Sequence, residues 1–421
     1  MRIKNTVITL KMPKKYDVAL HFAIIALVLF GTLMIVSTSV GNAGEDSLAP
    51  VKAGVKQFVF VLISYMMLTF FANNFSMGRA KKLLPWLSVV MMALLASNQF
   101  FPDVYGSKAW IQLQLAGQSI SIQPAEFAKV FMIIAMAVHI EIAGRNNWNT
   151  FTIMKSPMIY FLMCFVPIIL QKDMGTLLVF VALPCICFLV PSHRNLRKAQ
   201  KGMKLLIAAG IIGAFVLMSD VGVGVFKKID PLSHIASRIE NAANPFLDPY
   251  GTGYQPINGL YGIASGGLKG KGLGQSTQKY GYLTQSDSDY ILAIVIEETG
   301  IIGLGLIMIC YGLIIQRMFY YAIHTKSEGY KIILVGTAMY IFIHFVLNVG
   351  GVSGLIPLTG VPLLFISSGG SSLMSVMAAI GISQAVISRI RRQGTVKKIK
   401  KEPQGVRGSL RKGRGETKIG G

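Results

Sequence analysis

Long apolar runs separated by short polar stretches dominate this chain of 421 residues. An α-helix needs about 20 predominantly apolar residues to cross the hydrocarbon core of a bilayer. Ten runs approach this length, so the pattern predicts an all-α polytopic membrane protein. The predicted spans are 18–40, 55–73, 83–99, 124–143, 152–170, 174–190, 203–219, 289–316, 329–352 and 362–388.

The composition agrees with lipid as the solvent for most of the chain. Hydrophobic residues make up 52% and charged residues only 14%, whereas soluble domains are about one quarter charged. All four cysteines lie inside apolar runs, including the pair Cys185 and Cys187. Metal sites and disulfide frameworks need cysteines with paired spacings in polar loops, so we interpret these cysteines as packing residues.

Basic residues set the predicted orientation. The formal net charge is +23, and lysine and arginine gather in loops 74–82, 191–204 and 317–328 and at both ends of the chain. The alternate loops carry almost none. Because short cytoplasmic loops are enriched in these residues, both termini are expected in the cytoplasm, with no role in nucleic-acid binding.

This topology predicts three parts. Residues 1–17 form a cytoplasmic arm, 18–388 form a ten-helix membrane domain, and 389–421 form a basic, disordered cytoplasmic tail attracted to anionic lipid. One long exterior segment, 220–288, separates the seventh and eighth spans and is rich in Gly, Asn, Pro and Tyr. Long loops in compact proteins are functional or disordered, and this composition favours an ordered structure over the outer face.

Polar side chains converge on the exterior ends of the predicted helices. Each has a purely structural alternative: Glu126 and Lys129, one turn apart, could form an ion pair, and Asp289 could cap the eighth span. Several such groups on one membrane face indicate instead a site for an anionic, amphiphilic substrate. The candidates are Asp289, Glu126, Lys129, Asp173, Lys108 and Trp110.

Two further features remain open between structural and functional interpretations. Glu297 and Glu298 are adjacent acids inside a predicted membrane helix, where they need partners from the bundle or handle protons. The stretch 348–372 is dense in Gly, Pro and Ser. It predicts either broken backbone that lines a cavity or small residues that allow close helix packing.

These segments together resemble the SEDS family (shape, elongation, division and sporulation proteins). The resemblance runs from the first span to about Arg392, and the stretch 350–360 is most similar to the division branch. It rests on motifs in a fixed order: 106–111, 123–129, 171–176, 244–255, 270–274 with Lys279, 288–300 and 348–372. Such proteins are ten-helix peptidoglycan polymerases that use lipid II and work with a class B penicillin-binding protein.

The resemblance assigns roles to individual residues. The essential loop aspartate of the family falls on Asp289, and its polar cavity residues fall on Glu126, Lys129 and Trp110. Four positions depart from the family pattern. Ala109 stands where many members have arginine, Lys172 stands where many have proline, and Leu364 and Ser368 replace a proline and an aromatic residue. The motif-bearing residues Lys279 and Asp173 are further substrate-contact candidates.

Polymerisation requires a sugar hydroxyl to attack the anomeric carbon of a second lipid-linked sugar and to expel undecaprenyl pyrophosphate, with inversion. We expect Asp289 to act as the general base. Lys129, Lys108 or Arg238 would contact phosphate, and Glu126 would orient Lys129. A divalent cation, Mg²⁺ or Mn²⁺, is a candidate cofactor, although no all-protein metal cage is visible in the sequence.

Two rival functions come from other classes: a transporter that flips lipid II, and a non-catalytic scaffold for other division membrane proteins. A transporter should place functional polar residues near the bilayer midplane. Here they gather at the exterior ends of the spans, which favours an enzyme of the bacterial cell membrane, expected at the division septum.

Overall fold

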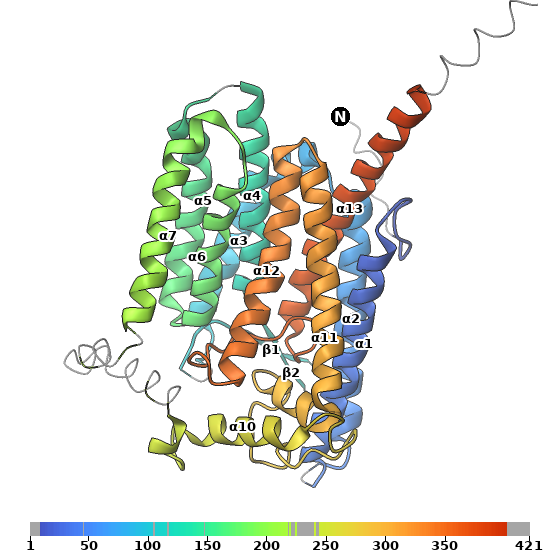
Figure 1. The fold of residues 1–421 in the computed structure, drawn as a ribbon, viewed down its shortest axis with the longest axis vertical. Coiled ribbons are helices and arrows are strands. Elements are labelled where there is room, and N and C mark those ends of the chain that lie inside the picture. The colour runs from blue at the N-terminus through green and yellow to red at the C-terminus, as the bar shows by residue number, and fades with distance from the viewer. Residues whose placement is uncertain are drawn as a thin grey trace, which may run out of the picture.

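The computed structural model describes residues 9–401, apart from 45, 104–105, 116–117, 147, 218, 220–223, 225–239 and 241–243. Within this part of the chain, long helices run side by side as a bundle (Figure 1). Nine of the described helices are long and apolar enough to cross a membrane, and one further apolar helix, α6, is shorter. The prediction of an all-α polytopic membrane protein is confirmed. The bundle helices are α1 (Val18–Ser39), α2 (Ala49–Asn74), α3 (Met77–Ser97), α4 (Pro124–Asn146), α5 (Thr150–Leu170), α6 (Met174–Leu189), α7 (Arg197–Leu217), α11 (Ile291–His324), α12 (Glu328–Val352) and α13 (Gly370–Lys401).

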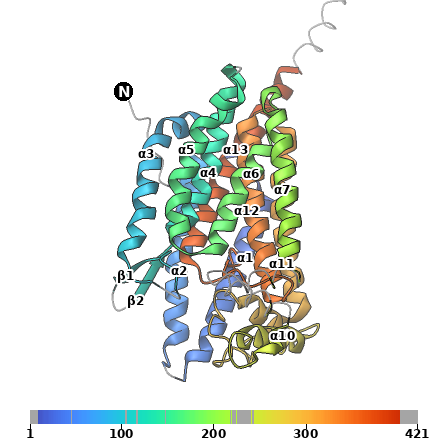
Figure 2. The ribbon, with the colours of Figure 1, turned by 90° about the vertical axis from the view of Figure 1, so that its left-hand side faces the viewer.

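The helices of the bundle differ in how far they are enclosed by their neighbours. In the membrane-length window of α13, 89% of the residues are buried, against 6% for α7. Figure 2 shows α7 at the edge of the bundle. The last predicted span is therefore the central helix of the fold, although its apolar pattern is no stronger than that of the others.

The start of this last span was predicted incorrectly. A helix was expected from 362, but α13 begins at Gly370, and 353–369 is a non-helical connection after α12. Gly354 and Gly360 have positive φ angles of 76° and 68°, and Pro362 lacks the amide hydrogen that a continuing helix needs. These residues interrupt the backbone despite the apolar composition. Other helix ends also differ: α2 begins at Ala49 rather than 55, and α11 runs from Ile291 rather than 289.

A short β-hairpin that the sequence interpretation did not predict precedes α4. Strand β1 (Ile111–Leu115) pairs antiparallel with β2 (Gln118–Ile122), and Ile111 lies opposite Ile122. Apolar and polar residues alternate in both segments, which is the period of a strand. The hairpin connects the segment that carries Lys108 and Trp110 directly to the first turn of α4. It lies at the same end of the bundle as helix α10 (Tyr254–Gly266), as Figure 2 shows; we call this end the α10 end.

The opposite end holds the start of α1 and the end of α13 (Figure 1). Asp17 is fully buried there. Its carboxylate accepts hydrogen bonds from Arg317 (2.5 Å), Arg391 (3.0 Å) and Tyr321 (2.7 Å). These bonds tie the predicted arm to α11 and α13. Helix α13, which carries Arg391, continues past the predicted domain boundary at 388 and ends at Lys401. Residues 402–421 of the predicted tail lie outside the described residues.

The exterior segment of the sequence interpretation, 220–288, is described mainly from 244 onward. Its helix α10 crosses the end of the bundle (Figure 1). Glu297 accepts a hydrogen bond from Lys271 at 2.5 Å, and Glu298 accepts one from Lys279 at 3.0 Å. Both acids thus anchor the segment to α11. Their cationic partners come from the segment itself, and Glu298 also accepts a hydrogen bond from the Ser37 hydroxyl of α1 at 2.6 Å. The contacts are structural.

Candidate functional site

Asp289 lies on a turn that immediately precedes α11. The N-cap residue of α11 is Tyr290, and it makes no side-chain cap hydrogen bond. The carboxylate of Asp289 accepts no hydrogen bond from any described residue. Its position instead depends on the backbone around it. Asn348 of α12 donates to the Asp289 carbonyl at 3.1 Å, so the turn is attached to the bundle at the aspartate itself.

The connection 353–369 holds the same turn from its other side. The Ser367 hydroxyl donates to the Ser288 carbonyl at 2.8 Å, and the Ser368 amide donates to the Asp287 carbonyl at 2.9 Å. Asn348 also donates to the Val361 carbonyl at 3.1 Å. Three successive carbonyls of the turn are therefore bound, which orients Asp289 without using its carboxylate.

Gly360 lies beside the carboxylate of Asp289. A Cβ atom added there would make an ordinary contact of 3.8 Å with Oδ2 of Asp289. Its φ of 68° is what favours glycine at this position. One residue earlier, Thr359 packs so closely on α6 that a Cβ atom on Gly175 would lie 2.1 Å from its carbonyl oxygen. The stretch that is dense in Gly and Pro therefore fits both interpretations. Its backbone is non-helical and runs beside Asp289, and Gly175 of α6 allows it to pack closely on that helix.

The electrostatic environment of Asp289 suits a base. The pKa of its carboxyl is raised from 3.8 to about 6, chiefly by burial and then by the negative charges of Asp173 and Asp287. A carboxylate with a pKa near 6 is mostly ionised at neutral pH and accepts a proton more readily than an ordinary aspartate. The structure therefore brings Asp173 close enough to Asp289 for their charges to interact.

Asp173 is fixed at the start of α6. It accepts a hydrogen bond from the Thr176 amide at 2.9 Å and one from the Gln123 side chain at 2.8 Å. The same turn carries Gln171, whose carbonyl accepts the Lys108 amide at 3.1 Å. Lys108 and Lys172 have exposed side chains. The turn between α5 and α6 therefore carries an acid that interacts with Asp289 and one accessible cation, Lys172, and the segment bound to this turn carries a second, Lys108.

Trp110 is half-buried two residues beyond Lys108, at the start of the hairpin. The carbonyl of the intervening Ala109 accepts a hydrogen bond from Asn98 at 3.0 Å, which fixes this segment to the end of α3. Gln171 is fully buried, and its side-chain amide has no hydrogen-bond partner among the described residues. Sequence reasoning named the motif around Gln171 but assigned this glutamine no role.

Glu126 and Lys129 form a buried ion pair of 2.7 Å inside the bundle. The Lys129 ammonium also donates to Nε2 of His344 at 3.0 Å, which leaves Nδ1 of that ring to donate to the Pro362 carbonyl at 3.1 Å. Tyr340 donates to Glu126 at 2.8 Å. The pair thus reaches the connection 353–369 through one histidine, and neither charged group is exposed.

His344 and Asn348 are site residues whose roles sequence reasoning missed. They lie one helical turn apart on α12, so both face the connection 353–369. His344 holds the Pro362 carbonyl, and Asn348 holds those of Val361 and Asp289. A histidine and an asparagine at this spacing in an otherwise apolar span were the available signal, since polar side chains within spans are costly to bury.

Two other substrate contacts were predicted. The Lys279 side chain is fully buried in its ion pair with Glu298. Arg238 falls outside the described residues. Among those that the structure describes, no group of three or more His, Cys, Asp or Glu side chains could hold a metal ion.

Comparisons with known proteins agree with this architecture. The model of the FtsW/RodA/SpoVE family, described as cell cycle proteins, matches residues 18–393. The chain is 32% identical to the probable peptidoglycan glycosyltransferase FtsW of Bacillus subtilis (strain 168), over 96% of this chain and 97% of that protein. It is 31% identical to stage V sporulation protein E of the same organism, over 87% and 95%.

Solved structures show the same fold. One, from work on the structural coordination of polymerization and crosslinking by a peptidoglycan synthase complex, has a TM-score of 0.65 and 22% identity, covering 90% of this chain and 100% of that one. The rod shape determining protein RodA of Thermus thermophilus has a TM-score of 0.56 and 22% identity, covering 89% and 97%. The resemblance drawn from the motifs is confirmed, and the chain belongs to the FtsW/RodA/SpoVE family of membrane-embedded cell cycle proteins.

Proposed function

We propose that this protein is a peptidoglycan glycosyltransferase that polymerises lipid II into glycan strands during cell division. The names of its FtsW relatives support this activity. The observation that carries it is the state of Asp289: a carboxylate with a pKa raised to about 6, no hydrogen-bond partner among the described residues, and a backbone bound on both sides. Structural aspartates usually have their oxygens satisfied.

In this mechanism Asp289 removes the proton from the attacking sugar hydroxyl. The hydroxyl oxygen then attacks the anomeric carbon of a second lipid-linked sugar, and the bond to undecaprenyl pyrophosphate breaks with inversion. The leaving group develops negative charge and needs cations. Lys108 and Lys172 are the accessible cations near Asp173, whereas Lys129 is enclosed in its ion pair. We therefore assign phosphate contact to Lys108 and Lys172, and we assign Lys129 and Glu126 a positioning role through His344.

A divalent cation enters this proposal with the substrate. The described residues do not form a cage for a resident metal ion, but Mg²⁺ is usually held by one or two carboxylates together with substrate phosphates. Mg²⁺ or Mn²⁺ bound to the pyrophosphate would neutralise charge on the leaving group.

The orientation and the partner are part of the same proposal. The distribution of basic loops favours both termini in the cytoplasm and the α10 end outside, where the proposed polymerisation would take place. A class B penicillin-binding protein is the proposed partner, together with other membrane proteins of the division septum. The likeness to a structure from a peptidoglycan synthase complex supports an assembly of this kind.

The test is polymerisation of purified lipid II by the purified protein, with and without the partner. Asp289→Asn keeps the side-chain size and removes the proton acceptor, and loss of a general base costs about 10²–10⁴-fold in rate. Asp103→Asn changes an exposed acid and is the matched control. If Asp289→Asn polymerises at the wild-type rate, Asp289 is not the base. If the wild-type protein instead moves lipid II across vesicles without polymerising it, the transporter alternative is correct.

A further inference from the structure

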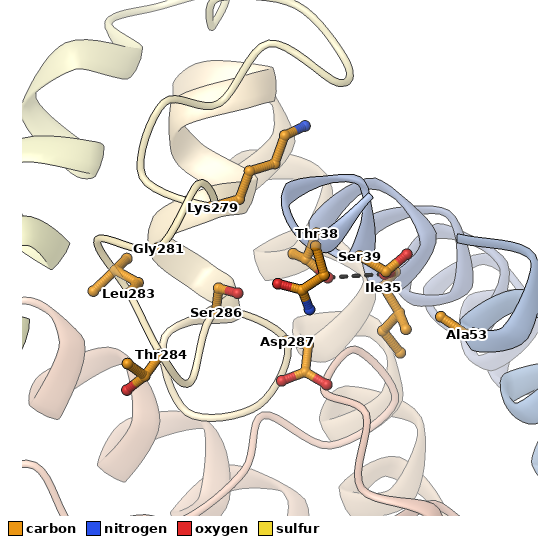
Figure 3. A pocket seen from close by; sticks show the side chains of 11 residues that line it. Ile35, Thr38, Ser39, Ala53, Lys279, Gly281, Leu283, Thr284, Ser286 and Asp287 are labelled. Atoms are coloured by element: carbon orange, nitrogen blue, oxygen red, sulfur yellow. Dashed lines mark hydrogen bonds between the residues drawn. The ribbon is translucent and has the colours of Figure 1, made fainter. Parts of the chain in front are cut away.

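A cavity of about 330 Å³ opens at the α10 end, away from the ion pair of Glu126 and Lys129. Its walls are the last turn of α1, the start of α2 and the segment 279–287. Figure 3 shows side chains from these three elements facing one space. The volume is at the lower end of the range of about 300–1,000 Å³ that is usual for ligand pockets. Its polar wall residues include Thr38, Ser39, Asn42, Thr284, Ser286 and Asp287.

The cavity is built on a fixed frame. Gly41 lies so close to the segment that a Cβ atom on it would be 2.1 Å from the Lys279 carbonyl oxygen. On the same segment, the Lys279 ammonium pairs with Glu298 at 3.0 Å, and Glu298 also accepts the Ser37 hydroxyl at 2.6 Å. Helix α1, segment 279–287 and α11 are thus joined beside the cavity, which keeps its walls apart without a ligand.

The wall chemistry excludes a highly charged or a purely apolar ligand. Lys279 is the cation among the lining residues, and its ammonium is already occupied by Glu298. A pyrophosphate would therefore find no available cation and would meet the Asp287 carboxylate. An acyl chain would leave the remaining donor and acceptor positions of the wall hydroxyl and amide groups unused, and each polar group buried with no hydrogen bond costs about 1–3 kcal/mol.

A neutral, hydroxyl-rich ligand satisfies these groups. The Thr38 and Ser39 hydroxyls donate within α1, to the Ile35 and Val36 carbonyls, so their oxygens remain as acceptors. The Thr284 oxygen accepts from Gln255, so its hydrogen remains available as a donor. Sugar hydroxyls both donate and accept, which matches a wall that offers both functions. Ile35 and Leu283 add apolar surface for the C–H faces of a sugar ring.

The cavity is also placed next to the reaction. Asp287, which lines it, is two residues before Asp289, so their Cα atoms lie within about 7 Å. The Asp287 carbonyl is bound by the Ser368 amide at 2.9 Å. The cavity wall and the proposed base therefore belong to one immobilised turn, and a sugar in the cavity would neighbour a sugar at Asp289.

We propose that this cavity is a saccharide subsite that binds a neutral sugar ring adjacent to the one that reacts at Asp289. The proposal rests on the proposed function of the same site, and it adds the class of ligand and its position. The ring could belong to the growing glycan strand or to the incoming lipid-linked monomer, and these two sources give different kinetic results.

The test fills the cavity. Ala53 lines it from α2, and Ala53→Phe would occupy the sugar position. Val55→Phe, at an exposed position two residues later, is the matched control. Saturation-transfer NMR with a neutral, soluble disaccharide of N-acetylglucosamine measures binding independently of activity. We expect binding to weaken about tenfold in Ala53→Phe, equivalent to about 1.4 kcal/mol, and to be unchanged in Val55→Phe. Ser286→Ala, which removes a single hydroxyl, should weaken binding less and guards against misfolding of the larger variant.

Polymerisation assays then separate the sources. If the cavity holds the growing strand, Ala53→Phe shortens the strands and leaves the KM for lipid II unchanged. If it holds the monomer, the KM rises and strand length is retained. Unchanged disaccharide binding, KM and strand length in a folded Ala53→Phe protein would overturn the subsite while leaving the proposed function intact. A wild-type protein that cannot polymerise lipid II would overturn the proposed function itself.

Discussion

The raised pKa of Asp289 predicts the acid limb of the pH profile. A base with a pKa of about 6 is about nine-tenths ionised at pH 7 and about one-tenth ionised at pH 5, so kcat/KM should fall about tenfold between these values. An aspartate with an ordinary pKa near ~3.9 would lose only about a tenth of its activity over the same range. The initial rate of lipid II polymerisation from pH 4.5 to 8 measures this limb.

Asp173→Asn tests the cause of the shift. Burial is the largest cause, and the negative charge of Asp173 is the second. Removing that charge makes ionisation of Asp289 easier, so its pKa falls and the acid limb moves to lower pH. The limb should not reach the ordinary value, because burial remains. Asparagine can still cap α6 through its side-chain oxygen, so the fold should be retained.

The pH at which kcat/KM falls, rather than its maximal value, decides this prediction. Asp103→Asn, which changes an exposed acid, should leave the limb where it is in the wild-type protein. A wild-type limb near pH 4 would refute the raised pKa. A limb near pH 6 that does not move in Asp173→Asn would show that Asp173 does not act on the base.

Three further predictions follow from the fold and the proposed mechanism. Thr252→Cys should react with a membrane-impermeant thiol reagent only from outside the cell, and labelling only from the cytoplasm would reverse the proposed orientation. Glu298→Gln leaves the fully buried Lys279 without its charged partner and should cost about 3–5 kcal/mol of stability, measured as a lower unfolding temperature in detergent. The double variant with Lys279→Met should recover part of the loss. An unchanged unfolding temperature in Glu298→Gln would show that the pair does not anchor the exterior segment. Chelation with EDTA should lower polymerisation and added Mg²⁺ or Mn²⁺ should restore it, whereas full activity in EDTA would remove the cation from the mechanism.

Sequence reasoning located the candidate base before any coordinates because the signal was local. An acid at the edge of a long apolar run is visible without knowledge of its neighbours. The same holds for the tight turn that carries Asp173. What the pattern could not supply was the pKa of Asp289, because that depends on burial and on Asp173, which is distant in the chain.

Other features required the tertiary structure for similar reasons. Lys129 and Lys279 were predicted to contact substrate, but their free charge depends on whether another part of the chain pairs with them, and the structure encloses both in ion pairs. The roles of His344 and Asn348 became visible only when the connection 353–369 was placed beside α12.

The sequence by itself determined that the chain crosses a membrane, roughly where each span lies, and which family it belongs to. These properties follow from the preference of each segment for lipid or water, and from short motifs whose residues are close in sequence. Only the tertiary structure decided that 362–369 is not helical, that α13 is the central helix, and that a polar cavity lies beside the Asp289 turn. Those properties depend on contacts between residues far apart in the chain, and apolar periodicity carries no information about them.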